Sequence, residues 1–295
     1  MRDFRFGFTL SFYPSQRELA ETCRAAEAYG YDVAVGVDHL GPGRFAPFQA
    51  LLAAALATEQ LRVGTYCINA GFWNPSILAR EVSTAARLTG GRLELGLGIG
   101  LIKEEFEAAG IPFLPFGQRV EWLNSTILEL RELMAAEPGV EMPPLLIGGT
   151  GERALRVVAE HADIAGFAGI HQIPGRPVGT LRIATAAEAE KQVASFRAAA
   201  GERADRVELN NFVKIVEVTD DRRAAAERIT QEDGPYLIDD VDDALETPFI
   251  LVGTEDEIAH QLVRDRDRYG FSYISVQRPH MEVLGPIIKR VRALA

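Results

Sequence analysis

The sequence predicts an α/β protein, a (β/α)8 or TIM barrel that forms a single domain over residues 1–295. Short β-rich runs alternate with helical patterns nearly from end to end, which is typical of a parallel sheet built from βα units. Eight such units can be counted, and eight parallel strands suit a closed barrel. No Gly/Ser-rich linker or exact repeat divides the chain, and its 47% hydrophobic content is ample for one continuous core.

The first four units are marked by apolar spacing and by residues that cap helices. Gly30 is expected to end the first helix, and Gly90-Gly91 to end the third. Asn74 supplies a cap before the third helix, and Pro75 follows it in the first turn. The expected elements of this half are strand 4–10, helix 15–29, strand 32–37, helix 46–59, strand 61–68, the helix from 74 to 90, strand 93–99 and helix 119–134.

The second half repeats the pattern with interruptions. Its expected elements are strand 143–149, a helix from 151, strand 163–169, strand 207–218, a helix from about 220, helix 254–270, strand 271–277 and a final helix to the carboxyl end. Inserted pieces are expected after strands four, six and seven. The acidic stretch 239–243 is expected to be irregular. The segment 171–183 is rich in Pro and Gly, so we expect a loop that acts as a mobile lid over the substrate.

A doubly wound open sheet is the alternative architecture. Such folds carry a Gly-x-Gly-x-x-Gly turn between the first strand and the first helix, because the backbone there approaches a pyrophosphate. The corresponding turn here, residues 11–16, contains no glycine, and the glycine-rich run 95–100 lies on the fourth strand instead. A closed barrel therefore explains the chain better.

Composition indicates the cellular compartment and argues against some classes of binding partner. The chain has 31 basic and 42 acidic side chains, a formal net charge of -11, which argues against a general role in binding nucleic acid or anionic membranes. Cys23 and Cys67 lie in apolar segments without neighbouring Cys or His at metal-finger spacing, so neither a disulfide framework nor a zinc site is indicated. No run reaches the roughly 18 apolar residues of a membrane helix. We expect a cytoplasmic protein with a small-molecule substrate.

The residues directly after the strands form the candidate site, because the carboxyl ends of barrel strands meet at one face. Asp38 and His39 follow the second strand, where an acid would accept hydrogen bonds from a ligand and a histidine would exchange a proton near neutral pH. A structural turn is the alternative explanation for this pair. The other strand ends contribute Tyr66, Cys67, Ile99, Gly100, Gly148, Gly149, Thr150 and Arg278.

The glycine-rich end of the fifth strand is a candidate phosphate site. Residues 148–151 lead directly into a helix, so free backbone N–H groups lie at the positive end of a helix dipole. A tight turn that requires positive φ is the alternative. The histidines 161, 171 and 260 share no ligand-like spacing with His39, and no set of His or carboxylate residues converges from several strand ends, so no metal site is expected.

Four segments resemble the luciferase-like oxidoreductases that depend on flavin or coenzyme F420. They are residues 25–39, which end in Asp-His, residues 61–100, residues 143–163 and residues 252–276. Each match is modest alone, but their order and spacing are specific. The resemblance implies the barrel fold, with a flavin-type ring lying across the carboxyl face against strands two to four.

The resemblance also implies roles for individual residues. Asp38 would contact the ring system, and His39 would lie beside its reactive edge as proton donor or acceptor. Relatives that use the deazaflavin carry a non-proline cis peptide, which would fall here at Tyr66-Cys67. Ile99 and Gly100 would line the ring or ribityl chain, and Gly148, Gly149 and Thr150 would bind the phosphate through backbone and hydroxyl donors. Apart from the resemblance, His171 at the start of the long loop and Arg278 after strand eight are expected to contact the substrate. Ile102 replaces a residue that is often polar in the family, and the nearby carboxylate of Glu105 is expected to be structural.

Three functions follow from this resemblance. The first is a coenzyme F420-dependent oxidoreductase that transfers a hydride to or from a small organic substrate. The second is an FMN-dependent monooxygenase, and the barrel alone does not separate these two. The third is a flavin-binding barrel without catalytic activity. A homodimer is expected in each case, because the helices that flank strands two to four have Ala-rich faces.

Overall fold

The main sheet of this computed structural model, which describes residues 2–10, 13–149, 151–173, 175–176, 180–231 and 236–295, is a closed parallel barrel. The barrel strands are β1 (Arg5–Leu10), β2 (Val33–Gly36), β3 (Arg62–Thr65), β4 (Ile68–Asn69), β5 (Leu93–Gly98), β6 (Leu145–Gly148), β7 (Ile164–Phe167), β10 (Glu208–Val213) and β14 (Phe271–Val276). β3 and β4 together take the third position, and the pairing of β3 with β5 closes the ring. The predicted (β/α)8 barrel is confirmed, and the open sheet is excluded.

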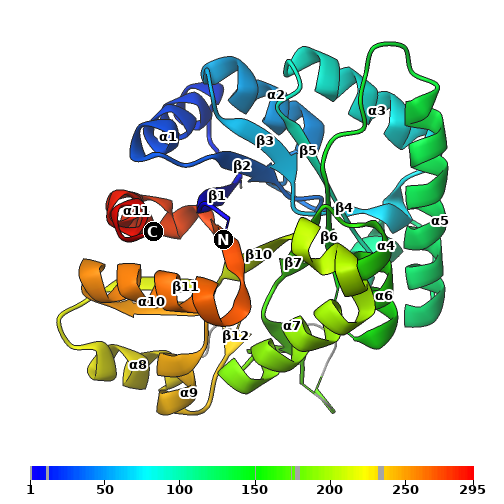
Figure 1. Cartoon of the computed structure of the whole chain (residues 1–295). Coiled ribbons are helices and arrows are strands. Elements are labelled where there is room, and N and C mark those ends of the chain that lie inside the picture. The colour runs from blue at the N-terminus through cyan, green and yellow to red at the C-terminus, as the bar shows by residue number, and fades with distance from the viewer. Residues whose placement is uncertain (1, 11–12, 150, 174, 177–179, 232–235) are drawn as a thin grey trace.

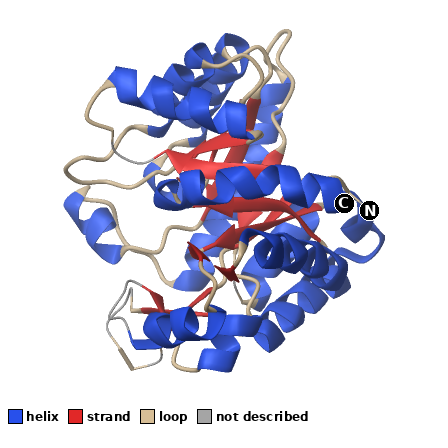
Figure 2. Ribbon diagram, turned by 90° about the vertical axis from the view of Figure 1, so that its left-hand side faces the viewer, coloured by secondary structure: helices blue, strands red, loops and turns tan. Residues whose placement is uncertain are grey.

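Helices surround the barrel on its outside (Figures 1 and 2). They are α1 (Gln16–Tyr29), α2 (Pro47–Ala57), α3 (Pro75–Leu88), α5 (Phe116–Ala135), α6 (Glu152–His161), α7 (Ala186–Ala200), α10 (Glu255–Tyr269) and α11 (Met281–Leu294). Two predicted helix ends are confirmed. Gly30 ends α1 with φ of 94°, and the Asn74 side chain accepts hydrogen bonds from the first backbone N–H groups of α3.

Inserted pieces follow the fourth, sixth and seventh barrel strands, as predicted. The first contains α4 (Lys103–Ala108), and the second forms a hairpin of β8 (Ile170–Gln172) and β9 (Leu181–Ile183). The third contains β11 (Ile215–Val218), α8 (Arg222–Gln231), β12 (Tyr236–Leu237), α9 (Val241–Glu246) and β13 (Ile250–Gly253). β12 pairs with β9, so the insertions after strands six and seven form one small sheet.

Several local predictions were wrong. Segment 171–183 is not wholly irregular, because its two ends belong to the β8–β9 hairpin; its role as a mobile lid stays a prediction, and residues 174 and 177–179 lie outside the described part. The acidic stretch 239–243 begins α9, which Asp240 caps. The expected strand 207–218 is two strands, and β11 leaves the barrel to pair with β13. α7 and β13 were not predicted.

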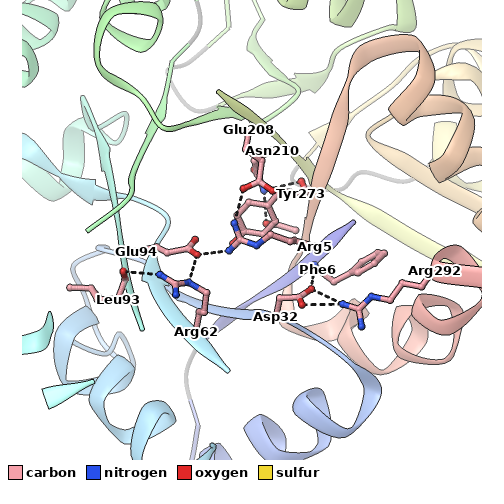
Figure 3. A network of polar contacts seen from close by, with 11 residues as sticks. Arg5, Phe6, Asp32, Arg62, Leu93, Glu94, Glu208, Asn210, Tyr273 and Arg292 are labelled. Atoms are coloured by element: carbon pink, nitrogen blue, oxygen red, sulfur yellow. Dashed lines mark hydrogen bonds and ion pairs between the residues drawn. The ribbon is translucent and has the colours of Figure 1, made fainter. Parts of the chain in front are cut away.

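An ionic network closes the amino end of the barrel (Figure 3). Arg5 forms ion pairs with Glu94 and Glu208, and the Nε of Arg62 lies 2.6 Å from the Glu94 carboxylate. Both carboxylates are buried, so the arginines supply the opposite charges that burial requires. Above this layer Val33, Val35, Leu146, Ile164 and Tyr273 pack together in the barrel interior. The candidate functional site therefore lies at the other end of the barrel, where the strands finish.

Candidate functional site

Asp38 follows β2 and is held by the chain that comes after β3. Its Oδ2 accepts a hydrogen bond from the indole N–H of Trp73 at 2.9 Å and from the backbone N–H of Asn69 at 3.1 Å. Burial raises the pKa of this carboxyl, and the two donors partly offset that effect. The carboxyl is therefore fixed in direction between strands two and three.

His39 forms a pair with Glu105, which lies on α4. Its Nδ1 is 3.0 Å from Oε1 and 3.2 Å from Oε2 of the carboxyl. The Glu105 side chain is 14% exposed and that of His39 is 40% exposed, so the imidazole reaches solvent while its partner is covered. If Nδ1 donates to the carboxylate, Nε2 is the nitrogen left to exchange a proton with a ligand. The expectation that Glu105 is merely structural missed this contact.

The peptide bond Tyr66–Cys67 is cis, as the resemblance implied, and it separates β3 from β4. The Tyr66 ring packs against Phe212 with 4.9 Å between centroids. Burial raises the pKa of the Cys67 thiol to about 12, so the thiol stays protonated at neutral pH and is no nucleophile. Tyr66 and Cys67 therefore contribute a contact surface, and neither supplies a nucleophile.

Four glycines follow or end the strands β5 and β6, and the reason for the absence of a side chain differs among them. A Cβ on Gly149 would lie 2.8 Å from the Cβ of Ala154, and one on Gly100, which has φ of 72°, would collide with the Asn69 side chain. Packing thus requires both glycines. At Gly98 and Gly148, the last residues of β5 and β6, a Cβ would meet only ordinary contacts among the described atoms, at 3.4 Å or more.

The start of α6 matches the expected phosphate site in part. Gly151 precedes the helix with φ of 85°, and no side chain of the described residues caps the first N–H groups of the helix. Glu152 in the first turn would oppose an anion, but it is ion-paired with Arg156. Thr150, predicted to donate its hydroxyl here, lies outside the described residues. Ile99 is 7% exposed, and Gly100 accepts a hydrogen bond from Arg119 through its carbonyl.

The two predicted substrate contacts lie in different surroundings. The Arg278 guanidinium stacks on the Tyr13 ring at 4.3 Å, and its backbone N–H donates to Thr9 at the end of β1. His171, on β8, has its Nε2 3.3 Å from the Gln192 amide on α7, and burial lowers its pKa. No contact between described residues links His171 to His39. The structure therefore places Arg278 at the barrel mouth and directs His171 towards the outer helix.

Sequence reasoning missed Trp73, and it named Glu105 without foreseeing its contact with His39. Trp73 lies inside the second matching segment, directly before the helix cap at Asn74, which was the signal available for it. The pairing of Glu105 with His39 carried no comparable signal. In the part of the chain that the structure describes, no cluster of three His, Cys, Asp or Glu side chains could hold a metal ion, and no helix is long and apolar enough to cross a membrane.

Comparison with protein families assigns the chain to one of them. The profile described as luciferase-like monooxygenase matches residues 5–272. The F420-dependent glucose-6-phosphate dehydrogenase of Intrasporangium calvum is 34% identical over 130 residues, which cover 41% of this chain and 39% of that protein. The chain thus matches about two fifths of the length of this curated relative.

Solved structures share the fold over nearly the whole chain. An F420-dependent secondary alcohol dehydrogenase in complex with an F420-acetone adduct has a TM-score of 0.76 at 15% identity, covering 98% of this chain and 99% of that one. A riboflavin lyase with modified FMN and riboflavin has a TM-score of 0.75 at 14% identity, covering 99% and 92%. At such identities the likeness extends to the fold alone.

Proposed function

The chain belongs to the luciferase-like monooxygenase family, and on that premise we propose that it is an oxidoreductase that uses coenzyme F420. In this proposal a hydride moves to or from a small organic substrate, and the bound coenzyme supplies the ring that accepts or donates it. Similarity to the F420-dependent dehydrogenase of Intrasporangium calvum favours coenzyme F420 over FMN, which is the alternative cofactor.

The observation that carries the proposal is the surface without side chains around Cys67. Gly98 and Gly148 flank this residue, and neither a positive φ nor a close neighbour among the described atoms requires a glycine at either position. Close approach of a flat ligand to the backbone is the remaining physical reason for a residue without Cβ. The N–H groups at the start of α6, which no side chain of the described residues caps, lie directly beyond β6 and suit a phosphate attached to such a ligand.

The roles of the polar side chains follow from their contacts. Asp38, held by Trp73 and Asn69, orients the ligand's polar edge through its second carboxyl oxygen. Glu105 holds the imidazole of His39 at Nδ1, so that Nε2 gives a proton to, or takes one from, the substrate oxygen as the hydride moves. The protonated Cys67 thiol adds no charge to the surface beneath.

A side-by-side titration tests this proposal. Purified protein is titrated with coenzyme F420 and with FMN, and binding is followed by fluorescence and absorbance. We expect tighter binding of coenzyme F420; comparable or tighter binding of FMN would reverse the ranking and favour a monooxygenase. Coenzyme F420 could also bind tightly and yet be neither reduced by any of a panel of alcohols nor reoxidised by any of a panel of carbonyl compounds and conjugated alkenes. That result would support a barrel without catalytic activity.

A further inference from the structure

Lys214 lies at the carboxyl end of the seventh barrel strand, directly after β10. Alternate residues of this strand face the barrel interior: Glu208 joins the ionic network, Asn210 donates to β14, and Phe212 comes next. The Lys214 Nζ lies 3.9 Å from the centroid of the Phe212 ring, so its side chain continues the same inward face. Lys214 therefore stands at the end of the barrel where Asp38 also lies.

The surroundings of this ammonium are aromatic. Besides the Phe212 ring, the Tyr236 ring lies 5.2 Å from Nζ, and the Tyr236 hydroxyl accepts a hydrogen bond from Gln277 at 3.4 Å. Lys214 is 3% exposed. Its backbone N–H donates to Phe249, so the strand end is tied down. The side chain is thus held in place by rings on two sides.

Among the residues that the structure describes, no carboxylate is paired with the Lys214 ammonium. Within the described ranges, Lys214 makes neither a hydrogen bond nor an ion pair through its side chain, although Arg5 on the same barrel axis is paired with two carboxylates. Burial alone lowers the pKa of Lys214 well below its usual value. Ring faces attract an ammonium but do not replace the hydrogen bonds that it loses on leaving water. An oxyanion would supply both the missing charge and the missing acceptors.

We propose that Lys214 is the anion-binding residue of the substrate site, and that the substrate carries an oxyanion, in the simplest case a carboxylate, on an apolar body. The apolar body would lie against the Phe212 and Tyr236 rings, while Gln277 adds a polar contact at the rim. The inference rests on the proposed oxidoreductase function only in calling this ligand a substrate. Nothing in it requires Lys214 to contact the coenzyme.

Lysine footprinting tests the proposal on the protein loaded with coenzyme F420. The chain has four lysines, Lys103, Lys191, Lys214 and Lys289, so acylation by acetic anhydride can be resolved residue by residue with mass spectrometry. The probes are benzoate, acetate and inorganic phosphate. We expect benzoate to slow acylation of Lys214 and to leave the other three lysines unaffected. Protection by phosphate alone would identify a phosphoryl group instead of a carboxylate, and no protection by any of the three would overturn the proposal.

Three variants complete the test by calorimetric titration. Lys214→Met is expected to weaken benzoate binding by about tenfold or more, while the binding of neutral benzamide stays unchanged. Lys214→Arg keeps the charge and should retain part of the affinity for benzoate. Lys289→Met, a change at an exposed lysine on α11, is the matched control and should behave as the parent protein. Equal loss of benzoate and benzamide would show that the mutation damages packing rather than an anion site.

Stability and coenzyme binding separate the remaining explanations. Replacing an unpaired buried ammonium by an apolar side chain of similar length should leave the melting temperature of the ligand-free protein unchanged or raise it. A clear fall in melting temperature would assign Lys214 a structural role and overturn the inference. Loss of coenzyme F420 affinity in Lys214→Met would place the residue in the cofactor site, again against it. Failure of the parent protein to bind the coenzyme would refute the proposed function instead, and footprinting of the ligand-free protein with the same probes would still report on the anion.

Discussion

Gly148→Ala should weaken cofactor binding without damaging the fold. The added Cβ would lie 3.8 Å from the Cys67 Sγ and 3.9 Å from the Gly166 carbonyl oxygen, both ordinary contacts. Gly148 also has no positive φ, so alanine can adopt its backbone conformation. In a strand, replacing glycine by alanine is favourable by roughly 0.5–1 kcal/mol through lower chain entropy. We therefore expect the free energy of unfolding of the ligand-free protein to stay constant or to rise slightly.

The effect on the cofactor has the opposite sign. A methyl group projecting from the end of β6 would occupy the space that the proposal gives to the ring or to its phosphate-bearing chain. Forcing an extra methyl into a packed contact costs about 1–3 kcal/mol, which corresponds to a roughly 5- to 150-fold higher dissociation constant for the cofactor. Fluorescence titration with coenzyme F420 measures this change, and urea unfolding of the same sample measures stability.

Gly149→Ala is the matched control, because its Cβ would lie 2.8 Å from the Ala154 Cβ and force β6 away from α6. It is expected to lower the free energy of unfolding by about 1–3 kcal/mol. If Gly148→Ala binds coenzyme F420 as tightly as the parent protein, the glycine surface around Cys67 is not the cofactor site. The central observation for the proposed function would then be lost.

Three further predictions address catalysis, pH dependence and assembly. His39→Ala should keep coenzyme affinity within about tenfold and lower turnover by roughly 100- to 10,000-fold; turnover that survives in the folded variant would make His39 a turn residue. Burial raises the pKa of Asp265 to about 7, so its contribution to stability is complete at acid pH below its ordinary pKa and is lost as the pH rises through about 7. Asp265→Asn should therefore flatten the fall in unfolding free energy between weakly acidic and weakly basic buffers, and an unchanged slope in urea titrations would refute this assignment. A homodimer is expected, with exposed Ile77 and Leu88 on α3 among its contacts, and light scattering that shows a monomer at micromolar concentration would exclude it.

Local signals in the sequence predicted the elements whose causes are themselves local. The glycine that ends α1 and the Asn-Pro pair that begins α3 act within one helical turn, and both were recognised from the sequence. α7 was not predicted, because only Ala189, Val193 and Phe196 form its buried side and its faces therefore differ little in hydrophobicity. Its capping box of Thr185 and Glu188 was the signal that could have found it.

Contacts between distant segments were harder to predict, and they include the most informative ones at the site. Barrel geometry brought Asp38 to the correct rim, since every strand of a parallel barrel ends there. It could not predict the His39–Glu105 pair, because that contact depends on where a short inserted helix folds back. The ionic network at the amino end of the barrel could not be predicted for the same reason, because Arg5 and Glu208 are 203 positions apart in the chain.

Glycine shows where sequence reasoning ends and structural reasoning begins. Residues 148–151 were predicted as a phosphate site or, alternatively, as a turn that needs positive φ, and the sequence offered no way to choose. In the structure these glycines have separate causes: Gly151 has a φ of 85°, Gly149 lies against α6, and Gly148 has neither constraint among the described atoms. Only a glycine without a conformational or packing cause argues for a ligand. For that reason the cofactor proposal depends on Gly148 and Gly98 rather than on the glycine-rich appearance of the segment.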